Sequence, residues 1–313
     1  MTHTSPANCV PDGFADAVLA WGLPQLRDLP WRSTRDPWAV VVSELMLQQT
    51  QVARVLPKYL AFLVQFPTAA SCAAASLGDV LRLWQGLGYP RRARNLYLLA
   101  QSVSAVGAFP DTLEGLQQLP GVGPYTARAV LAFAFERDVA VVDTNIARVY
   151  ARVLGAPLTQ RQVQGVADSA VPDGDGWAWN QSLMDLGAVL CRPTSPNCGE
   201  CPIRPLCTWG SADVEPSPVD MPTSTVDRPT RGADPAVGSA GVSGRQARFD
   251  GSDRQARGRL LAAVQHGMID GADVPAAMQR DAATAERLLA ALCTEGLVIV
   301  DRDAHRSVVR LPD

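Results

Sequence analysis

The sequence predicts an all-α protein followed by a small C-terminal module. Apolar residues recur at helical spacing through residues 1–210, and prolines separate the segments. Four cysteines gather in one loop at 191–207. Residues 211–252 are rich in Pro, Ser, Thr, Gly and Ala and have almost no large apolar side chains. We therefore expect a disordered linker there, before a separate module at 253–313.

The expected helices follow from the apolar spacing. They are Phe14–Trp21, Pro37–Leu47, Val52–Phe66, Asp79–Leu83, Arg91–Val103, Thr126–Phe135, Ile146–Leu154 and Trp177–Leu190. The β-branched run Val139–Val142 is the only strand-like stretch of this part. In the module, three helical segments (253–267, 272–279 and 283–296) precede two strand-like ones (297–300 and 307–311). This order indicates a winged-helix-like domain.

Composition excludes some classes of protein and leaves others open. The chain has 313 residues, 47% of them apolar, which is enough for one large or two ordinary domains. No apolar run is long enough to span a membrane, and the first residues lack the pattern of a secretory signal. The net charge of −3 does not suggest nucleic acid. A protein that binds DNA through backbone amides and a local arginine cluster, however, does not need a positive net charge.

A glycine-rich turn precedes the apolar helix expected near residue 126. Gly121 and Gly123 allow positive φ and close backbone approach, and Pro124 suits the first turn of a helix. The amides of Gly121, Val122 and Gly123 would then face outwards at a helix N-terminus, where a phosphate can bind. An ordinary turn between two helices gives the same pattern.

Two acidic residues occupy positions that suggest a role for the carboxyl group. Glu44 lies in an otherwise apolar helix, where a carboxyl costs free energy unless it has a partner or a task. A carboxyl buried there would hold its proton and could act as a general acid, whereas a glutamate on a solvated helix face is the alternative. Asp143 follows the β-branched run and precedes a helix, which is typical of an N-cap.

Four of the seven cysteines have the spacing C-x6-C-x2-C-x5-C. They are Cys191, Cys198, Cys201 and Cys207. Because no export signal precedes them, structural disulfides are not expected. Four thiolates this close together can surround a metal centre, and the spacing alone allows either a zinc ion or a 4Fe-4S cluster.

The turn, Asp143 and the cysteine loop together resemble the helix-hairpin-helix DNA glycosylases related to endonuclease III. The string LPGVGPYTA, an aspartate about twenty residues later and the 6-2-5 cysteine spacing carry the resemblance. It implies a two-lobed fold, with a six-helix lobe at about 34–139 and a cluster lobe made of 1–33 and 140–210. It also implies one 4Fe-4S cluster, a hairpin that grips a DNA phosphate, and Asp143 at the deoxyribose.

The string SELMLQQTQV around Glu44 is similar to the signature of the adenine-specific, MutY-type branch of that family. In that branch the glutamate protonates N7 of adenine, so the resemblance makes Glu44 and Asp143 the catalytic pair, assisted by Tyr125 and Asn145. It places five residues at the adenine: Arg27, Trp31, Arg32, Leu47 and Asp185. Core packing is the alternative for the apolar members of this set.

The resemblance also implies residues that contact the DNA duplex. These are Gln48, Gln49 and Thr50 where the adenine leaves the stack, Tyr89, Arg91 and Arg92 at the opposite base, and Gly121, Val122 and Gly123 at the hairpin. Pro90 departs from the family pattern, which usually has a second tyrosine there. For the arginines, a solvated surface is the alternative.

Tyr125 indicates which reaction to expect. Glycosylases of this family that also cut the strand carry a lysine at this hairpin position, and the chain's only lysine is Lys58, in another helix. We therefore expect hydrolysis alone: a monofunctional enzyme that releases adenine mispaired with 8-oxoguanine or guanine in double-stranded DNA, during base-excision repair. An endonuclease III-like glycosylase for oxidised pyrimidines and a catalytically silent DNA-damage-binding module are the alternatives.

The resemblance covers residues 14–209 and ends before the module. The usual MutY carries a longer, Nudix-like domain that inspects the 8-oxoguanine, and residues 253–313 do not resemble it. We expect a monomer in the bacterial cytoplasm, associated with the nucleoid and not with a membrane. The sequence names no protein partner.

Overall fold

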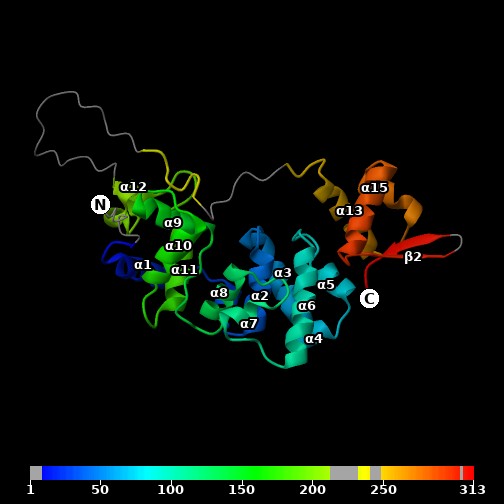
Figure 1. Cartoon of the computed structure of the whole chain (residues 1–313), viewed down its shortest axis with the longest axis horizontal. Coiled ribbons are helices and arrows are strands. Elements are labelled where there is room, and N and C mark those ends of the chain that lie inside the picture. Colours follow the sequence, from blue (N-terminus) through cyan, green and yellow to red (C-terminus); the bar gives the residue numbers. More distant parts are fainter. Residues whose placement is uncertain (1–8, 212–231, 240–247, 304–305) are drawn as a thin grey trace, which may run out of the picture. The chain divides into compact units, whose positions relative to one another are not determined.

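The computed structural model describes residues 9–211, 232–239, 248–303 and 306–313. The chain forms two compact units: Met1–Asp28 with Leu131–Gly244, and Leu29–Val130 with Arg245–Asp313. Both consist mainly of helices, and a small sheet lies in the C-terminal module (Figure 1). The expected all-α fold class with a small additional module is confirmed.

The first unit, built from residues 1–28 and 131–244, has an aromatic core. Its elements are α1 (Phe14–Gly22), η1 (Leu23–Gln25), α9 (Thr144–Leu154), α10 (Gln160–Ala170), α11 (Gly176–Val189), η3 (Cys198–Glu200), η4 (Arg204–Leu206) and α12 (Thr208–Ser211). The ring of Phe14 packs against Tyr150 and Trp179, with centroids 6.2 and 5.7 Å away. These contacts join α1, α9 and α11 although the helices are far apart in sequence.

The second unit holds most of the remaining helices. They are η2 (Pro30–Arg32), α2 (Pro37–Leu47), α3 (Val52–Gln65), α4 (Ala69–Ala73), α5 (Leu77–Leu83), α6 (Arg91–Val106), α7 (Leu113–Gln117) and α8 (Pro124–Phe133), the last of which runs across the boundary between units. Trp38, Phe62, Phe66 and Trp84 form its aromatic core. Asp36 caps α2 by accepting the N–H of Trp38, and Pro37 occupies the first turn.

The apolar spacing predicts eight of the α-helices within residues 9–211 and gives no sign of four others. The missed helices are α4, α7, α10 and α12. Three are short, and α10 has few large apolar residues, so their apolar pattern is weak. N-caps mark three of them instead: Thr68 and Thr159 form capping boxes at the start of α4 and α10, and Thr112 caps α7.

The strand-like interpretation of Val139–Val142 is wrong. These residues form no strand, and their backbone polar groups bond to a side chain instead of a neighbouring strand. Val141 N–H donates to Oδ1 of Asn180 (2.8 Å), and Nδ2 of Asn180 donates to the carbonyl of Val139 (2.9 Å). The run therefore stays extended without a sheet, because Asn180 bonds to two of its backbone groups and Gln164 Nε2 donates to a third, the carbonyl of Ala140 (3.4 Å).

The C-terminal module has the winged-helix order of elements. They are α13 (Asp253–Gln265), β1 (Ile269–Asp270), η6 (Gly271–Asp273), α14 (Val274–Met278), α15 (Ala282–Thr294), β2 (Ile299–Arg302) and β3 (Ser307–Arg310). The antiparallel sheet has the order β1-β3-β2, with Ile269 opposite Val309 and Val300 opposite the same residue. The sequence missed the two-residue β1 and placed β2 two residues too early.

The module packs against the helices of its own unit. Gly78 N–H donates to the carbonyl of Pro312 (2.9 Å), and Gln265 Nε2 donates to the carbonyl of Leu81 (3.1 Å). Arg91 Nη2 lies 2.7 Å from Glu295 Oε1, and Arg257 binds the other carboxylate oxygen. The hydrogen bond from Arg91 and the pair with Arg257 lower the pKa of Glu295 to about 2.

We predict that Glu295→Gln weakens this unit in a pH-dependent way. A carboxyl whose pKa falls on folding stabilises the folded state above its unfolded pKa of about 4.5, and this contribution disappears as the pH falls towards about 2. Urea unfolding should show the variant less stable than wild type at pH 7, with the difference shrinking between about pH 4.5 and 2. Glu286→Gln, at an exposed position of α15, is the control; an equal loss there would contradict the prediction.

The expected disordered linker is partly wrong. Residues 212–231 and 240–247 lie outside the described residues, but residues 232–239 pack on the first unit. Ala236 and Ser239 are buried, and Ser239 Oγ accepts the N–H of Leu158 (3.0 Å). Small side chains fit closely against a surface, so a composition typical of disorder does not exclude packing.

Candidate functional site

The glycine turn joins α7 to α8 and leaves open space outside the helix N-terminus. Gly121 has φ of 80°, and a Cβ there would lie 2.7 Å from Cβ of Asn95. Gly123 is not in the left-handed region, contrary to expectation, and a Cβ there would meet nothing within 4 Å. Gly121 is thus needed for the turn and its packing, whereas Gly123 keeps the approach to the amides clear. Tyr125 follows in the first turn of α8 and is partly buried.

Glu44 lies inside α2 and is buried, with 7% of its surface exposed. Its neighbours Ser43, Leu45 and Met46 are buried as well. A carboxyl in such a position is not on the solvated helix face that the sequence left open as an alternative. Leu47 at the end of the helix is partly buried.

The three residues that follow α2 form a tight turn. Gln48 Nε2 donates to Thr126 Oγ1 of α8 (3.4 Å), and the hydroxyl of Thr50 donates to the carbonyl of Leu87 (3.3 Å). Gln49 is exposed and has φ of 54°, a conformation that non-glycine residues rarely adopt. Backbone strain of this kind often marks a functional residue.

Arg92 is buried, so it is a structural brace and not the DNA contact we expected. Its Nη1 donates to the carbonyls of Leu45, Met46 and Gln48 at 2.6–3.0 Å. Its Nη2 donates to Thr50 Oγ1 and to the carbonyls of Leu87 and Gly88 at 3.0–3.1 Å. Burial lowers the pKa of Arg92 to about 10. One guanidinium thus fixes the end of α2 to the loop before α6. By contrast, Arg91 has a largely exposed side chain.

Trp31 and Arg32 lie in η2 and are buried, with 7% and 8% exposed. The Trp31 ring packs edge-on against Tyr59, with centroids 5.3 Å apart. Burial, with the nearby Asp36 carboxylate, raises the pKa of Tyr59 to about 12. Trp31 therefore has the core contact that the sequence analysis left as an alternative, and its role at a base stays a prediction.

Asp143 is the N-cap of α9, as expected. Its Oδ1 accepts the N–H groups of Asn145 (2.9 Å) and Ile146 (2.7 Å), and its Oδ2 accepts Nδ2 of Asn145 (2.8 Å). Burial raises the pKa of Asp143, and these hydrogen bonds and the charge of Arg148 oppose the rise. The carboxylate is held in one orientation by three donors.

Arg148 links Asp143 to the cysteine loop, and the sequence analysis missed it. Its Nη2 donates to Oδ1 of Asn145 (2.8 Å) and to the carbonyl of Gly187 (2.7 Å), and its Nε donates to the carbonyl of Cys191 (2.7 Å). The sequence does carry one sign of this role: α9 is otherwise mostly apolar and has two arginines four residues apart.

Arg27 and Asp185, both expected at the adenine, form an ion pair. The Asp185 carboxylate accepts Nε of Arg27 (2.6 Å) and its backbone N–H (3.0 Å). Asp185 lies in α11 and is only 2% exposed. These residues, Asp143 and the cysteines belong to the first unit, whereas Glu44 and Tyr125 belong to the second. The meeting of the two carboxylates about one sugar therefore stays a prediction.

The four cysteines line one hollow. Apolar side chains complete the wall: Val149, Val153, Leu190 and Ile203. Burial raises the pKa of Cys201 to about 11, so a cation must compensate before this thiol loses its proton. Within the described ranges, no three His, Cys, Asp or Glu side chains converge as ligands of a single ion. The donor set is soft and sulfur-only, which suits zinc or an iron–sulfur cluster.

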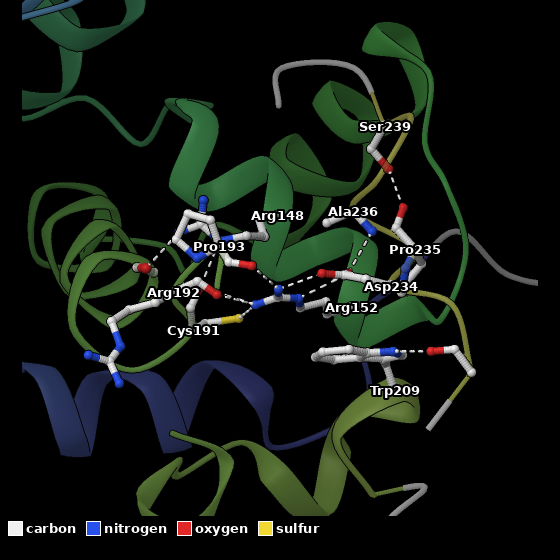
Figure 2. Close-up of polar contacts among 12 residues, drawn as sticks. Arg148, Arg152, Cys191, Arg192, Pro193, Trp209, Asp234, Pro235, Ala236 and Ser239 are labelled. Atoms are coloured by element: carbon white, nitrogen blue, oxygen red, sulfur yellow. Dashed lines mark hydrogen bonds and ion pairs between the residues drawn. The ribbon is translucent and has the colours of Figure 1, made fainter. Parts of the chain in front are cut away.

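Arg152, the second arginine of α9, is part of the lining of this hollow, and Figure 2 shows its polar contacts. Its Nη1 donates to Sγ of Cys191 (3.2 Å) and to the carbonyl of Arg192 (2.8 Å). Its guanidinium stacks 4.5 Å from the ring of Trp209 and binds both carboxylate oxygens of Asp234, at 3.1 and 2.6 Å. Asp234 lies in the segment we had expected to be disordered.

The fold and the hairpin define a class of protein: the helix-hairpin-helix DNA glycosylases. A family model for the HhH-GPD superfamily base excision DNA repair proteins matches residues 42–167. The chain is 30% identical to a thermostable thymine-DNA glycosylase structure, with a TM-score of 0.61 over 63% of this chain and 95% of that one. An endonuclease III–DNA complex shares the fold, with a TM-score of 0.56 and 23% identity over 63% of this chain and 93% of that one.

Within that class, the chain belongs to the adenine DNA glycosylase family. It is 38% identical to the adenine DNA glycosylase of Mycolicibacterium smegmatis over 290 residues, which cover 90% of this chain and 91% of the relative. The human adenine DNA glycosylase is 43% identical over 211 residues, which cover 62% of this chain and 39% of the relative. The mycobacterial match is long enough to extend into the C-terminal module.

Proposed function

We propose that this protein hydrolyses the N-glycosidic bond of adenine mispaired with 8-oxoguanine or guanine in duplex DNA, as a step of base-excision repair. The buried Glu44 in a member of the adenine DNA glycosylase family carries the proposal. A base must leave the stack before its sugar bond can be reached, so the adenine is flipped into the protein. In the hairpin, the N–H groups of Gly121 and Gly123 bind a backbone phosphate, whereas the N–H of Val122 donates to the carbonyl of Leu119 (3.1 Å).

In this proposal two carboxyl groups have different catalytic roles. Glu44 protonates the adenine at N7, which makes the base a better leaving group. As the bond to C1′ breaks, positive charge develops on the sugar, and the carboxylate of Asp143 stabilises it. Asn145 and two backbone N–H groups hold that carboxylate in place. Water then completes an abasic site, following the two-carboxylate logic of glycoside hydrolysis.

Tyr125 leads us to predict a monofunctional enzyme. A strand-cutting glycosylase needs an amine to form a Schiff base with the sugar, and the position after Pro124 carries a phenol. In single-turnover assays on A opposite 8-oxoguanine, G or T, we expect breaks in the adenine strand only after hot alkali. Breaks without alkali at thymine glycol would favour an endonuclease III-like enzyme. Binding without any cleavage would favour a silent damage-binding module.

We further propose that the four-cysteine hollow holds one 4Fe-4S cluster, which would fasten the loop at 191–207 to α9 and α11. In such a cluster each cysteine binds a different iron, whereas a single zinc ion needs all four sulfurs about 2.3 Å from one point. All four cysteines line one hollow, and among the described residues no three such side chains converge on a single ion, which fits the cluster better. Anaerobically purified protein should contain about four irons and four sulfides per chain. Stoichiometric zinc without iron would overturn the assignment.

We place the protein in the bacterial cytoplasm, as a monomer bound to the chromosome. Within the described part of the chain, no helix has the length and hydropathy of a membrane span. Size-exclusion chromatography with light scattering, with and without a mispaired duplex, tests whether the protein is a monomer.

A further inference from the structure

The loop before α6 holds Tyr89 in an uncommon backbone conformation. Tyr89 has φ of 48°, and Gly86 and Gly88 beside it have φ of 89° and 73°. Trp84 Nε1 and Arg92 Nη2 donate to the carbonyl of Gly88 (both 3.1 Å), so the scaffold below fixes the loop. A strained, rigidly supported aromatic residue at a partly exposed position is a candidate for a contact with a partner.

The C-terminal module reaches this tyrosine through Arg254, the second residue of α13. Arg254 Nη1 donates to the hydroxyl of Tyr89 (3.1 Å), and its guanidinium lies 5.9 Å from the Tyr89 ring centroid. The same guanidinium lies 5.2 Å from the ring of Phe249, which precedes α13. Arg92 lies 5.4 Å from the Tyr89 ring. Tyr89, Arg254 and Phe249 thus form a series of ring, cation and ring, which we call the aromatic–arginine platform.

The platform has the chemistry of a nucleic-acid contact. Phe249 is 50% exposed, so part of its ring is open to a ligand. Aromatic rings stack on nucleobases, and an adjacent arginine adds a cation–π contact and a charge for phosphate. The platform is therefore better suited to DNA than to a purely apolar partner.

The platform is continuous with the hairpin that we propose to grip DNA. Tyr89 is two residues before α6, and Asn95, one turn into α6, packs against Gly121. Because a helix rises about 1.5 Å per residue, Asn95 lies about 6 Å along α6 from its first residue, Arg91. The same duplex can therefore contact both.

We propose that the winged-helix module forms part of the DNA-contacting face. Arg254 is a positioning residue that orients Tyr89, and Phe249 stacks on a nucleobase at or next to the base opposite the adenine. This inference rests on the proposed function. It gives the module a part in recognising the opposite base.

Two kinds of measurement test the platform. Affinity is measured by fluorescence anisotropy on two duplexes that carry the non-hydrolysable nucleoside 2′-fluoro-2′-deoxyadenosine. In one duplex it lies opposite 8-oxoguanine, and in the other it lies opposite G. The single-turnover rate is measured on the corresponding cleavable duplexes. We expect Phe249→Ala and Arg254→Ala each to weaken binding opposite 8-oxoguanine about tenfold, which is the scale of one lost base–aromatic contact. The loss opposite G should be smaller.

A double-mutant cycle separates positioning from general destabilisation. Tyr89→Phe removes the hydroxyl that Arg254 binds, so Arg254→Ala should have a smaller effect in that background. Arg254→Lys should restore only part of the binding, because the planar guanidinium is what stacks on the rings. Arg287→Ala removes an arginine of the same module that forms an exposed ion pair with Asp253, and it should bind like wild type.

The outcomes distinguish this inference from the proposed function. Wild type that binds the duplex but releases no adenine would refute the proposed function, while the affinities still test the platform. Phe249→Ala that binds like wild type, or additive effects of Tyr89→Phe and Arg254→Ala, would overturn the inference even if excision is normal. Phe249 is exposed, so its substitution tests the platform without loss of folding.

Discussion

Replacing Glu44 with glutamine should slow adenine release by orders of magnitude while leaving the fold intact. Glutamine has nearly the same shape but cannot deliver a proton to N7, so the leaving base departs as a poorly stabilised anion. General acid catalysis contributes typically about 10²–10⁴-fold, and we expect the single-turnover rate to fall by that factor. The rate would be measured on a duplex with A opposite 8-oxoguanine, followed by hot alkali.

The control for this prediction is affinity for the duplex that carries 2′-fluoro-2′-deoxyadenosine opposite 8-oxoguanine. Because Glu44 is buried in α2 and its replacement is isosteric, binding and thermal unfolding should change little. Glu114→Gln, at an exposed position of α7, should release adenine at the wild-type rate. A Glu44→Gln enzyme with undiminished rate would refute the general-acid assignment.

Replacing Arg152 with alanine should cause the largest loss of stability. The side chain is 1% exposed, and its loss removes the hydrogen bonds that it donates to the Asp234 carboxylate, the Cys191 sulfur and the carbonyl of Arg192. Burial alone would lower the pKa of Arg152, but the bonds to Asp234 and Cys191 raise it above its ordinary value. Breaking a buried ion pair from one side costs about 3–5 kcal/mol. Urea unfolding measures the free energy, and iron analysis should show a lower iron content.

Two further variants give the Arg152 prediction its specificity. Arg161→Ala removes an exposed arginine of α10 and should leave both stability and iron content unchanged. Asp234→Asn keeps the shape but weakens the pair, so we expect a smaller loss than for Arg152→Ala. If Arg152→Ala matched Arg161→Ala, the ion pair would not be what fastens residues 232–239 to the first unit.

The sequence predicted the features that depend on local pattern. Periodicity placed α2 at Pro37–Leu47 correctly, and the acid before a helix identified Asp143 as an N-cap. Both are decided by neighbours within a few residues, through helical spacing and capping. The burial of Glu44 was not decided by its apolar neighbours, because the sequence left a solvated helix face as the alternative; the structure shows the residue 7% exposed.

The sequence could not predict contacts between distant segments. Asp234 looked like part of a polar linker because its partner Arg152 is 82 positions away. Arg92 looked like a surface cation because arginine is usually exposed, and its carbonyl partners depend on how α2 ends. Arg254 carried no local signal at all, since its contact with Tyr89 spans 165 positions. Such roles are decided by tertiary packing.

The contact of Gly78 with Pro312 has a consequence for how the protein folds during synthesis. The second unit is built from residues 29–130 and 245–313, so its first part leaves the ribosome well before the second. At about 5–20 residues per second, the surface around Leu81 waits on the order of tens of seconds for α13 and β3. Contacts of such high sequence separation also slow folding. The nascent chain therefore exposes an incomplete apolar surface, and chaperones that hold such surfaces should raise the yield of folded protein.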